Sequence, residues 1–459
     1  MASAALLAMT SAALLLSNVG KTRFFGDESG WISYSYQTTD LFLNGEFGPR
    51  QLSSLWDNYG NLNPQLGKLL LGIPLVACSD LLLDGARYTA VFPWNRPGSY
   101  QERLARAEVP PREILLLARS ITALYGVLCV LTVFACTAML FGVWAGLLAG
   151  ALVLGSPLFV ESVTRSMTDA QFNWLLVLAL LVEAPALRAH PRRRDLILAA
   201  LCGLVAGLAS SVKLTGFLTI GVTHLSLLGL RVLREKLSLR RAGENAALFA
   251  FVTLTSIYTL NPFYWPEVSE IRPAELMREV RGFAFDGKRV ELPLPFLDYM
   301  GAVYYNRKEI VDEFPQLYNL LRPFELPAHF LRWRTLTVAQ AKMFSWPGPR
   351  LEVIGRRLAI DFTNFRFEWI FLIWGTAAHL RRAISEWRAG RVSAYLVPPL
   401  WFAANLVLLL SLVRFYGDRY FLPTVVAERI LIAVGLFSAA DLLLRRVRAR
   451  FPASSVARS

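Results

Sequence analysis

Two adjacent carboxylates, Asp27 and Glu28, come shortly after an apolar segment, SAALLAMTSAALLLSN (residues 3–18). Other ionisable residues stand at the ends of further apolar segments: Asp169, Lys213, Arg414, Asp418 and Arg419. A carboxylate can take a proton from a hydroxyl group, and a cation can hold an anionic group such as a phosphate. If these residues share one face of the protein, they suit a reaction with an anionic lipid.

The composition indicates what kind of chain positions them. Of its 459 residues, 54% are hydrophobic and 18% are charged, and the mean hydropathy is +0.41. An average soluble protein carries about 25% charged residues. Because long apolar segments recur from end to end, the sequence predicts an all-α polytopic membrane protein. The net charge of +14 lies largely in linkers between these segments, which indicates contacts with anionic membrane lipids and not with nucleic acid.

Four basic linkers predict the orientation of the chain. They are residues 188–194, 231–241, 381–391 and 445–450. The positive-inside rule places all four in the cytoplasm, which gives about ten transmembrane helices with both ends inside.

The two acidic centres constrain the first half of this topology. Asp27 and Asp169 lie on the same, outer side only if one of the three apolar segments between them does not cross. Segment 64–83 contains two prolines and two charged residues, so we expect it to lie in the outer interface. The five arginines of residues 84–112 favour the opposite placement.

The cysteines give no sign of a metal site or a disulfide. All four stand in apolar surroundings without the spacing of metal ligands, and we expect them to be small core residues. They are Cys78, Cys129, Cys136 and Cys202.

Several short motifs occur in a recognisable order. They are GDE after the first apolar segment, NPQLGKLLLGIPL, LARSITALYGVLCVLTV, GSPLFVESVTRSMTDAQF, GLASSVKLTG, NPFYWP and DRYFLPTVV. This set resembles the superfamily C (GT-C) membrane glycosyltransferases of the protein O-mannosyltransferase and lipid A aminoarabinose transferase type. It covers most of the chain except about residues 270–360. Where that family commonly has His-Pro-Pro-Leu, this chain has Asn63-Pro64-Gln65-Leu66, so the basic group often found there is missing.

The resemblance implies a reaction and its partners. The enzyme would move a sugar from a polyprenyl-phosphate donor to a hydroxyl of a protein, glycan or lipid, on the extracytoplasmic face of the cell membrane. Phosphate leaves readily, so the reaction needs a carboxylate that takes the acceptor's proton and cations that stabilise the phosphate. Direct displacement with one base implies inversion at the sugar carbon.

The resemblance also implies the roles of the carboxylates. Asp27 is the predicted general base, Glu28 positions the acceptor, and Asp169 orients the site. No cofactor is required. A Mg²⁺ or Mn²⁺ ion bridging Asp27 and Asp169 is an open alternative, because these ions prefer oxygen ligands.

Cations and polar residues complete the predicted site. Lys213 or Arg419 would contact the donor phosphate, with Arg119 as the weaker candidate. The predicted substrate-positioning residues are Asn63, Lys68 and Tyr420.

The predicted organisation has three parts. Residues 1–262 form a catalytic transmembrane module with a first outer loop at 19–112. Residues 263–366 form a second long extracytoplasmic loop, whose stretches PAELMREVRGF and LYNLLRPF predict interfacial helices over the acceptor entrance. Residues 367–459 hold the last transmembrane helices and a basic cytoplasmic tail.

Two other functions remain alternatives. A transporter or flippase for a lipid-linked or anionic substrate would also carry charges at membrane depth, but the sequence has no inverted repeat or paired broken helices. An inactive family member that acts as a binding scaffold is the other alternative, and the presence of Asp27 and Asp169 argues against it.

Overall fold

The computed structural model describes residues 2–46, 64–90, 100–187, 192–213, 215–261, 368–412 and 422–450. Within these ranges all regular structure is helical, which confirms the predicted all-α class. The helices are α1 (Ala2–Asn18), α2 (Gly26–Leu43), α4 (Leu66–Leu82), α5 (Tyr100–Ala105), α6 (Arg112–Phe141), α7 (Val143–Leu154), α8 (Pro157–Val163), α9 (Asp169–Ala186), α10 (Arg192–Ser210), α11 (Gly216–Arg234), α12 (Leu239–Leu260), α19 (Glu368–Arg388), the 3₁₀ helix η4 (Ala394–Leu396), α20 (Val397–Leu412) and α21 (Leu422–Arg450).

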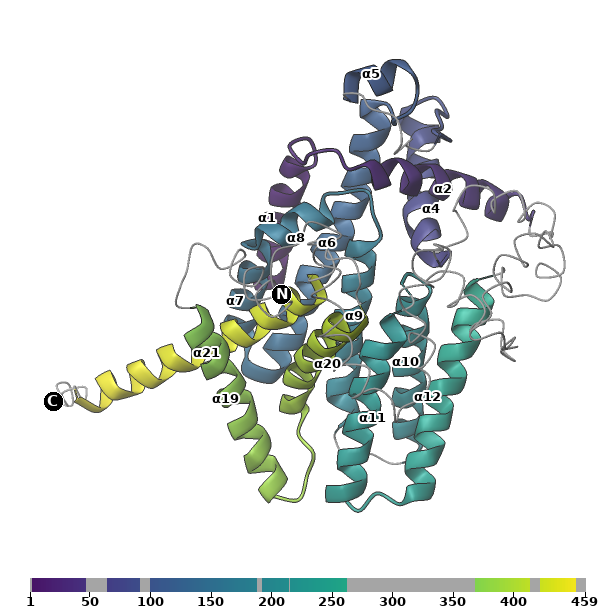
Figure 1. The fold of residues 1–459 in the computed structure, drawn as a ribbon. Helices are drawn as coiled ribbons and strands as arrows, with labels where there is room; N and C mark the ends of the chain where they lie inside the picture. The colour runs from purple at the N-terminus through teal and green to yellow at the C-terminus, as the bar shows by residue number, and fades with distance from the viewer. Residues whose placement is uncertain are drawn as a thin grey trace, which may run out of the picture.

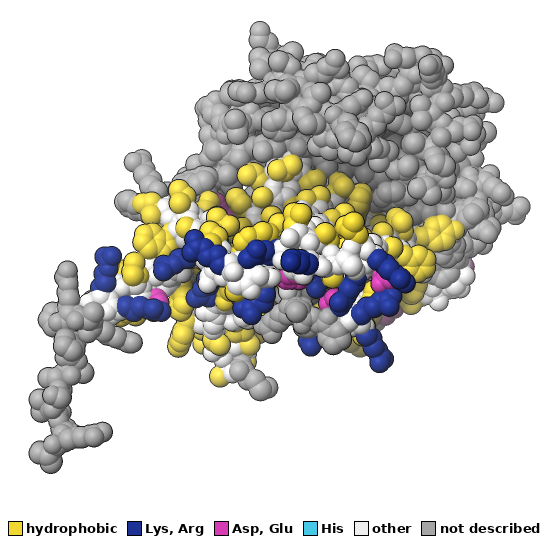
Figure 2. All heavy atoms as spheres, turned by 90° about the horizontal axis from the view of Figure 1, so that it is seen from below, with side chains coloured by type: hydrophobic (Ala, Val, Ile, Leu, Met, Phe, Trp, Pro, Cys, Tyr) yellow, Lys and Arg dark blue, Asp and Glu magenta, His cyan; other side chains and the backbone are white. Residues whose placement is uncertain are grey.

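The long helices form a bundle with one basic end. Helices α6, α9, α10, α11 and α12 run side by side (Figure 1). The α11–α12 and α19–α20 linkers meet at the lower end, where Arg234 donates to the Trp387 carbonyl at 2.6 Å. Figure 2 shows a band of Lys and Arg side chains across this end. The basic linkers 231–241 and 381–391 therefore share one end of the bundle, as predicted.

Some helices are long and apolar enough to cross a membrane. In the described part of the chain these are α6 and α11, and α7 with α8 makes a third if this pair, bent by 72°, is one span. The bend follows from Pro157 at the start of α8, where the Ser156 hydroxyl accepts from the Phe159 N–H. Helix α21 runs across the direction of the other long helices (Figure 1). The full count of about ten spans stays a prediction.

Helices α2 and α4 lie beyond the bundle, at the end opposite the basic linkers (Figure 1). Helix α4 begins beside the ends of α10 and α12. There the Leu66 N–H donates to the Ser211 carbonyl, just after α10, at 3.0 Å. Helix α2 crosses it closely at Gly72, where a Cβ atom would lie 2.1 Å from the Thr39 hydroxyl oxygen. The expectation that segment 64–83 lies in the outer interface of the membrane stays a prediction.

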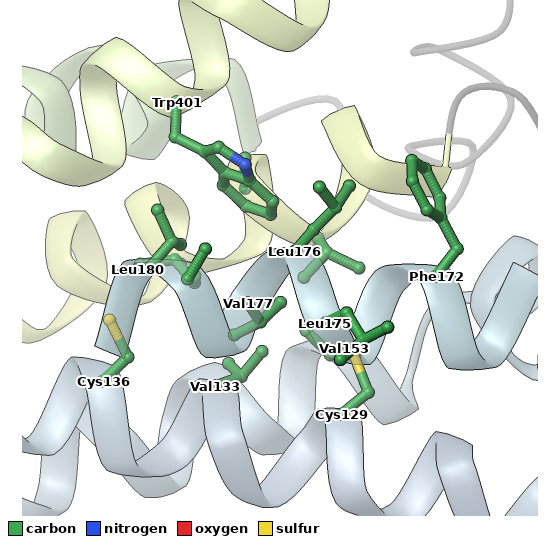
Figure 3. Close-up of a cluster of buried hydrophobic side chains, with 14 of the residues drawn as sticks. Cys129, Val133, Cys136, Val153, Phe172, Leu175, Leu176, Val177, Leu180 and Trp401 are labelled. Carbon is green, nitrogen blue, oxygen red and sulfur yellow. The ribbon is translucent and has the colours of Figure 1, made fainter. Parts of the chain in front are cut away.

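The core of the bundle is apolar and closely packed. Figure 3 shows side chains of α6, α7 and α9 meeting Trp401 of α20. Two of the cysteines, Cys129 and Cys136, are fully buried among them, as expected of core residues.

Several predicted features lie outside the described residues. These are Asn63, Arg414, Asp418, Arg419, Tyr420 and the second outer loop with its interfacial helices.

The orientation of the bundle can be tested with two exposed positions at opposite ends. In a variant without native cysteines, Lys21→Cys should react with an impermeant maleimide in intact cells, because it precedes α2 at the predicted outer end. Arg240→Cys, in the α11–α12 linker region, should react only after permeabilisation. Labelling of Arg240→Cys alone in intact cells would reverse the predicted orientation.

Candidate active site

A buried ion pair organises the end of the bundle opposite the basic linkers. The Arg119 guanidinium of α6 donates through Nε to Glu28 Oε1 at 2.8 Å and through Nη2 to Glu28 Oε2 at 2.7 Å. The Glu28 and Arg119 side chains are 0% and 3% exposed. Two parallel charge-assisted bonds fix the relative orientation as well as the distance of their partners.

The same pair holds two loops. Glu28 also accepts the backbone N–H groups of Phe25 at 2.9 Å and Ser166 at 2.8 Å. Arg119 Nη1 donates to the carbonyls of Val19 at 2.8 Å and Thr22 at 2.7 Å. Residues 19–28 and the turn before α9 are thereby tied to α6 and to each other. We call this set of contacts the Glu28–Arg119 brace.

Asp27 and Glu28 differ in environment although they are neighbours in sequence. Glu28 faces inward and uses both of its oxygens in the brace. Asp27, in the first turn of α2, is partly exposed. The first turn of a helix also offers backbone N–H groups without intrahelical partners, which favour anionic groups nearby. Of the two carboxylates, Asp27 is therefore the one that a substrate can reach.

The second acidic centre is paired with a lysine. Asp169 opens α9 and is buried, and its Oδ1 contacts the Lys213 ammonium from the turn between α10 and α11. The Lys213 ammonium also lies 5.6 Å from the centroid of the Phe172 ring. The Lys213 side chain is 24% exposed, so its ammonium stays accessible from solvent while Asp169 holds it in place.

A second lysine lies close by in α4. Gly67 packs so tightly on the turn before α9 that a Cβ atom would lie 2.5 Å from the Thr168 methyl group. The next residue, Lys68, is 1% exposed, and its ammonium donates to Gln65 Oε1 at 3.2 Å. Burial lowers the pKa of Lys68 to about 7.

Backbone and amide contacts join this lysine to the ends of the bundle helices. The Gln65 N–H donates to Asn261 Oδ1 at 2.9 Å, and Asn261 Nδ2 donates to the Ser211 hydroxyl at 3.2 Å. Gln65, Ser211 and Asn261 were not among the predicted site residues. Their sequence signal is that each lies within one of the quoted motifs: Gln65 in NPQLGKLLLGIPL, Ser211 in GLASSVKLTG and Asn261 in NPFYWP.

The described candidate site residues therefore lie at one end of the bundle, and they differ in how far they are exposed. Asp27 and Lys213 are partly exposed, whereas Glu28, Arg119, Asp169 and Lys68 are buried. Glu28 and Arg119 could contact a substrate only by breaking the brace. The geometry thus favours a positioning role for both, and their predicted substrate contacts stay predictions.

A divalent ion bridging Asp27 and Asp169 does not fit the side chains as they stand. The Lys213 ammonium already occupies Asp169 Oδ1, and it would repel a second cation at that oxygen. The side chains at this site therefore do not support a catalytic step through a metal.

Comparison with known proteins shows a likeness in fold. No family model matches the sequence, and no curated protein matches it either. The archaeal oligosaccharyltransferase AglB from Archaeoglobus fulgidus, in complex with an inhibitory peptide and a dolichol-phosphate, has a TM-score of 0.56 and 15% identity, covering 100% of this chain and 52% of that chain. A second structure of the A. fulgidus oligosaccharyltransferase, with Zn and sulfate, has a TM-score of 0.53 and 15% identity, covering 99% and 51%. ArnT from Cupriavidus metallidurans, bound to undecaprenyl phosphate, has a TM-score of 0.46 and 13% identity, covering 97% and 63%.

The likeness is one of fold. The chain has the fold of part of the archaeal oligosaccharyltransferase AglB. It spans 52% of the length of that AglB chain and 63% of that of ArnT.

The brace can be tested by its contribution to stability. Glu28→Gln leaves the buried Arg119 charge without its counter-ion, so we expect a loss of about 3–5 kcal/mol in unfolding free energy, measured in detergent. The matched control is Glu244→Gln. Glu244 binds Arg192 with the same forked geometry, at 3.0 and 2.8 Å, but these side chains are 27% and 61% exposed. The control should lose less than about 1 kcal/mol. Equal losses of unfolding free energy at the two sites would show that the brace stabilises the fold no more than an exposed ion pair does.

Proposed function

We propose that this protein is an integral membrane glycosyltransferase that moves a sugar from a polyprenyl-phosphate donor to an acceptor hydroxyl. The observation that carries the proposal is that a partly exposed carboxylate, Asp27, and a partly exposed cation, Lys213, both lie at the braced end of the bundle. The shared fold supports it, because the AglB structure is a complex with a dolichol-phosphate and a peptide. The site works on the extracytoplasmic face of the cell membrane.

The reaction begins at Asp27. Its carboxylate takes the proton of the acceptor hydroxyl as the hydroxyl oxygen attacks the anomeric carbon of the sugar. A positioned general base contributes typically ~10²–10⁴-fold to the rate. The bond between the anomeric carbon and the phosphate oxygen breaks on the opposite side, so the configuration at that carbon inverts.

The leaving phosphate is held by cations. Lys213 is the first of these, because Asp169 fixes its ammonium at the edge of the site. A phosphate oxygen next to Lys213 shares the ammonium with Asp169, which keeps the cation in place before and after the donor binds. Arg419 and the polar side chains of Asn63 and Tyr420 belong to the proposal as further phosphate and substrate contacts.

Lys68 gives the site a second cation of a different kind. Burial lowers the pKa of its ammonium to about 7, and an anionic phosphate nearby would favour the charged form.

The proposed base can be tested directly. Asp27→Asn keeps the size of the side chain but removes its basicity, so turnover should fall by about 10²-fold or more while donor binding is retained. The assay is sugar transfer from a polyprenyl-phosphate donor by the purified protein in liposomes. Asp40→Asn, at the other end of α2, is the matched control and should keep near-normal turnover. A near-normal rate for Asp27→Asn would remove Asp27 from the mechanism, and movement of the intact donor across the bilayer without transfer would favour a flippase.

The proposed phosphate contact predicts a change in donor affinity. Lys213→Ala removes a charge-assisted partner worth about 1.5–3 kcal/mol. The donor Kd should therefore rise about 10- to 100-fold. Lys236→Ala, just beyond the other end of α11, is the control and should bind the donor normally. Because Lys213→Ala leaves Asp169 buried without its counter-ion, the double variant Lys213→Ala/Asp169→Asn provides a second test with balanced charge. Normal donor affinity in the double variant would contradict the assignment.

A further inference from the structure

Three side chains with metal-binding atoms meet far from the proposed active site. Glu183 of α9, Cys202 of α10 and His224 of α11 bring their ligand atoms within 4.8 Å of one another. Glu183 follows Asp169 by fourteen residues along α9, or about 21 Å at 1.5 Å per residue. All three residues are buried, with exposed fractions of 2%, 0% and 7%.

The polar contacts of this group are incomplete. His224 Nδ1 lies 2.8 Å from Glu183 Oε1, and the His224 ring stacks on Phe249 with centroids 4.4 Å apart. His224 Nε2 is buried and has no hydrogen-bond partner among the described residues. The Cys202 thiol contacts the same Glu183 carboxylate. Buried polar atoms without partners are rare in folded proteins, so hydrogen bonds alone do not satisfy the polar atoms of this group.

The chemistry of the three donors is that of a borderline-soft metal ion. A thiolate sulfur, an imidazole nitrogen and a carboxylate oxygen are the three ligand types that zinc uses in proteins. Hard ions such as Mg²⁺ and Ca²⁺ prefer oxygen ligands alone. The donor set therefore points away from these ions.

The charges of the group also match a divalent cation. A thiolate and a carboxylate carry two negative charges, which is costly in an apolar interior unless they are compensated. A neutral imidazole and one divalent ion bring the sum to zero.

From these observations we propose that Glu183, Cys202 and His224 bind a divalent transition-metal ion, with zinc as the ion that fits best. The ion lies among α9, α10 and α11, apart from the proposed reaction site. It joins the helix that begins with Asp169 to the two helices whose turn carries Lys213. Its role is therefore structural, and it stabilises the bundle that supports the site.

Metal content gives the first test. The full-length protein is purified in detergent, stripped with a chelator, incubated with ZnCl₂ and desalted, and its zinc is measured by elemental analysis. Wild type should retain about one zinc per chain, as expected of a single site, and Cys202→Ser should lose most of it. The matched control is Cys129→Ser, because Cys129 is also fully buried in a helix of the same core but lies outside the group. Cys129→Ser should retain the zinc.

A spectrum tests the ligand itself. Co²⁺ in place of zinc should give a thiolate-to-cobalt charge-transfer band in wild type and Cys129→Ser, and none in Cys202→Ser. If Cys202→Ser does not fold, Glu183→Gln serves as the second variant, since it keeps a hydrogen-bonding group beside His224 and should weaken zinc retention at least tenfold. A wild-type protein without stoichiometric zinc and without the thiolate band would overturn the proposal. So would equal zinc in wild type and Cys202→Ser.

Discussion

The buried pair of Glu28 and Arg119 is the interaction on which the end of the bundle opposite the basic linkers depends. Burying two charges costs several kcal/mol per ion unless their remaining donors and acceptors are satisfied. Here Glu28 accepts two backbone N–H groups in addition to the guanidinium, and Arg119 donates to two backbone carbonyls. These four backbone bonds belong to the loops that lead to Asp27 and Asp169. The pair therefore fixes how the two loops lie relative to α6 and to each other.

Part of this arrangement follows from the sequence and part does not. Apolar segments and basic linkers are local signals, and they correctly predicted an all-helical chain with linkers 231–241 and 381–391 at one end. The different states of Asp27 and Glu28 depend on where α2 begins, since neighbouring residues of a helix point about 100° apart. The partner of Glu28 is 91 residues away, and no local pattern marks it.

The cysteines show the same limit of prediction from local sequence. Metal-ligand motifs are recognised when the ligands are close in sequence, and none of the four cysteines has such neighbours. The core interpretation is right for Cys129, Cys136 and Cys202, which all lie in the apolar core. At Cys202, helix packing also brings Glu183 and His224, which are 41 residues apart, to one place. Periodicity places each of the three on a helix, but only the packing of α9, α10 and α11 brings them together.

The distribution of polar and apolar groups bears on how a lipid-linked donor would bind. The proposed reactive groups sit where bundle helices begin or end, whereas mid-helix side chains such as Leu128, Leu201 and Phe251 are 41%, 42% and 67% exposed. An exposed apolar surface of this kind suits contact with hydrocarbon chains. A polyprenyl phosphate has the same division, with one charged end and a long apolar tail. In the proposed function its phosphate would contact Lys213 while its apolar tail lies along the exposed apolar surface of the bundle.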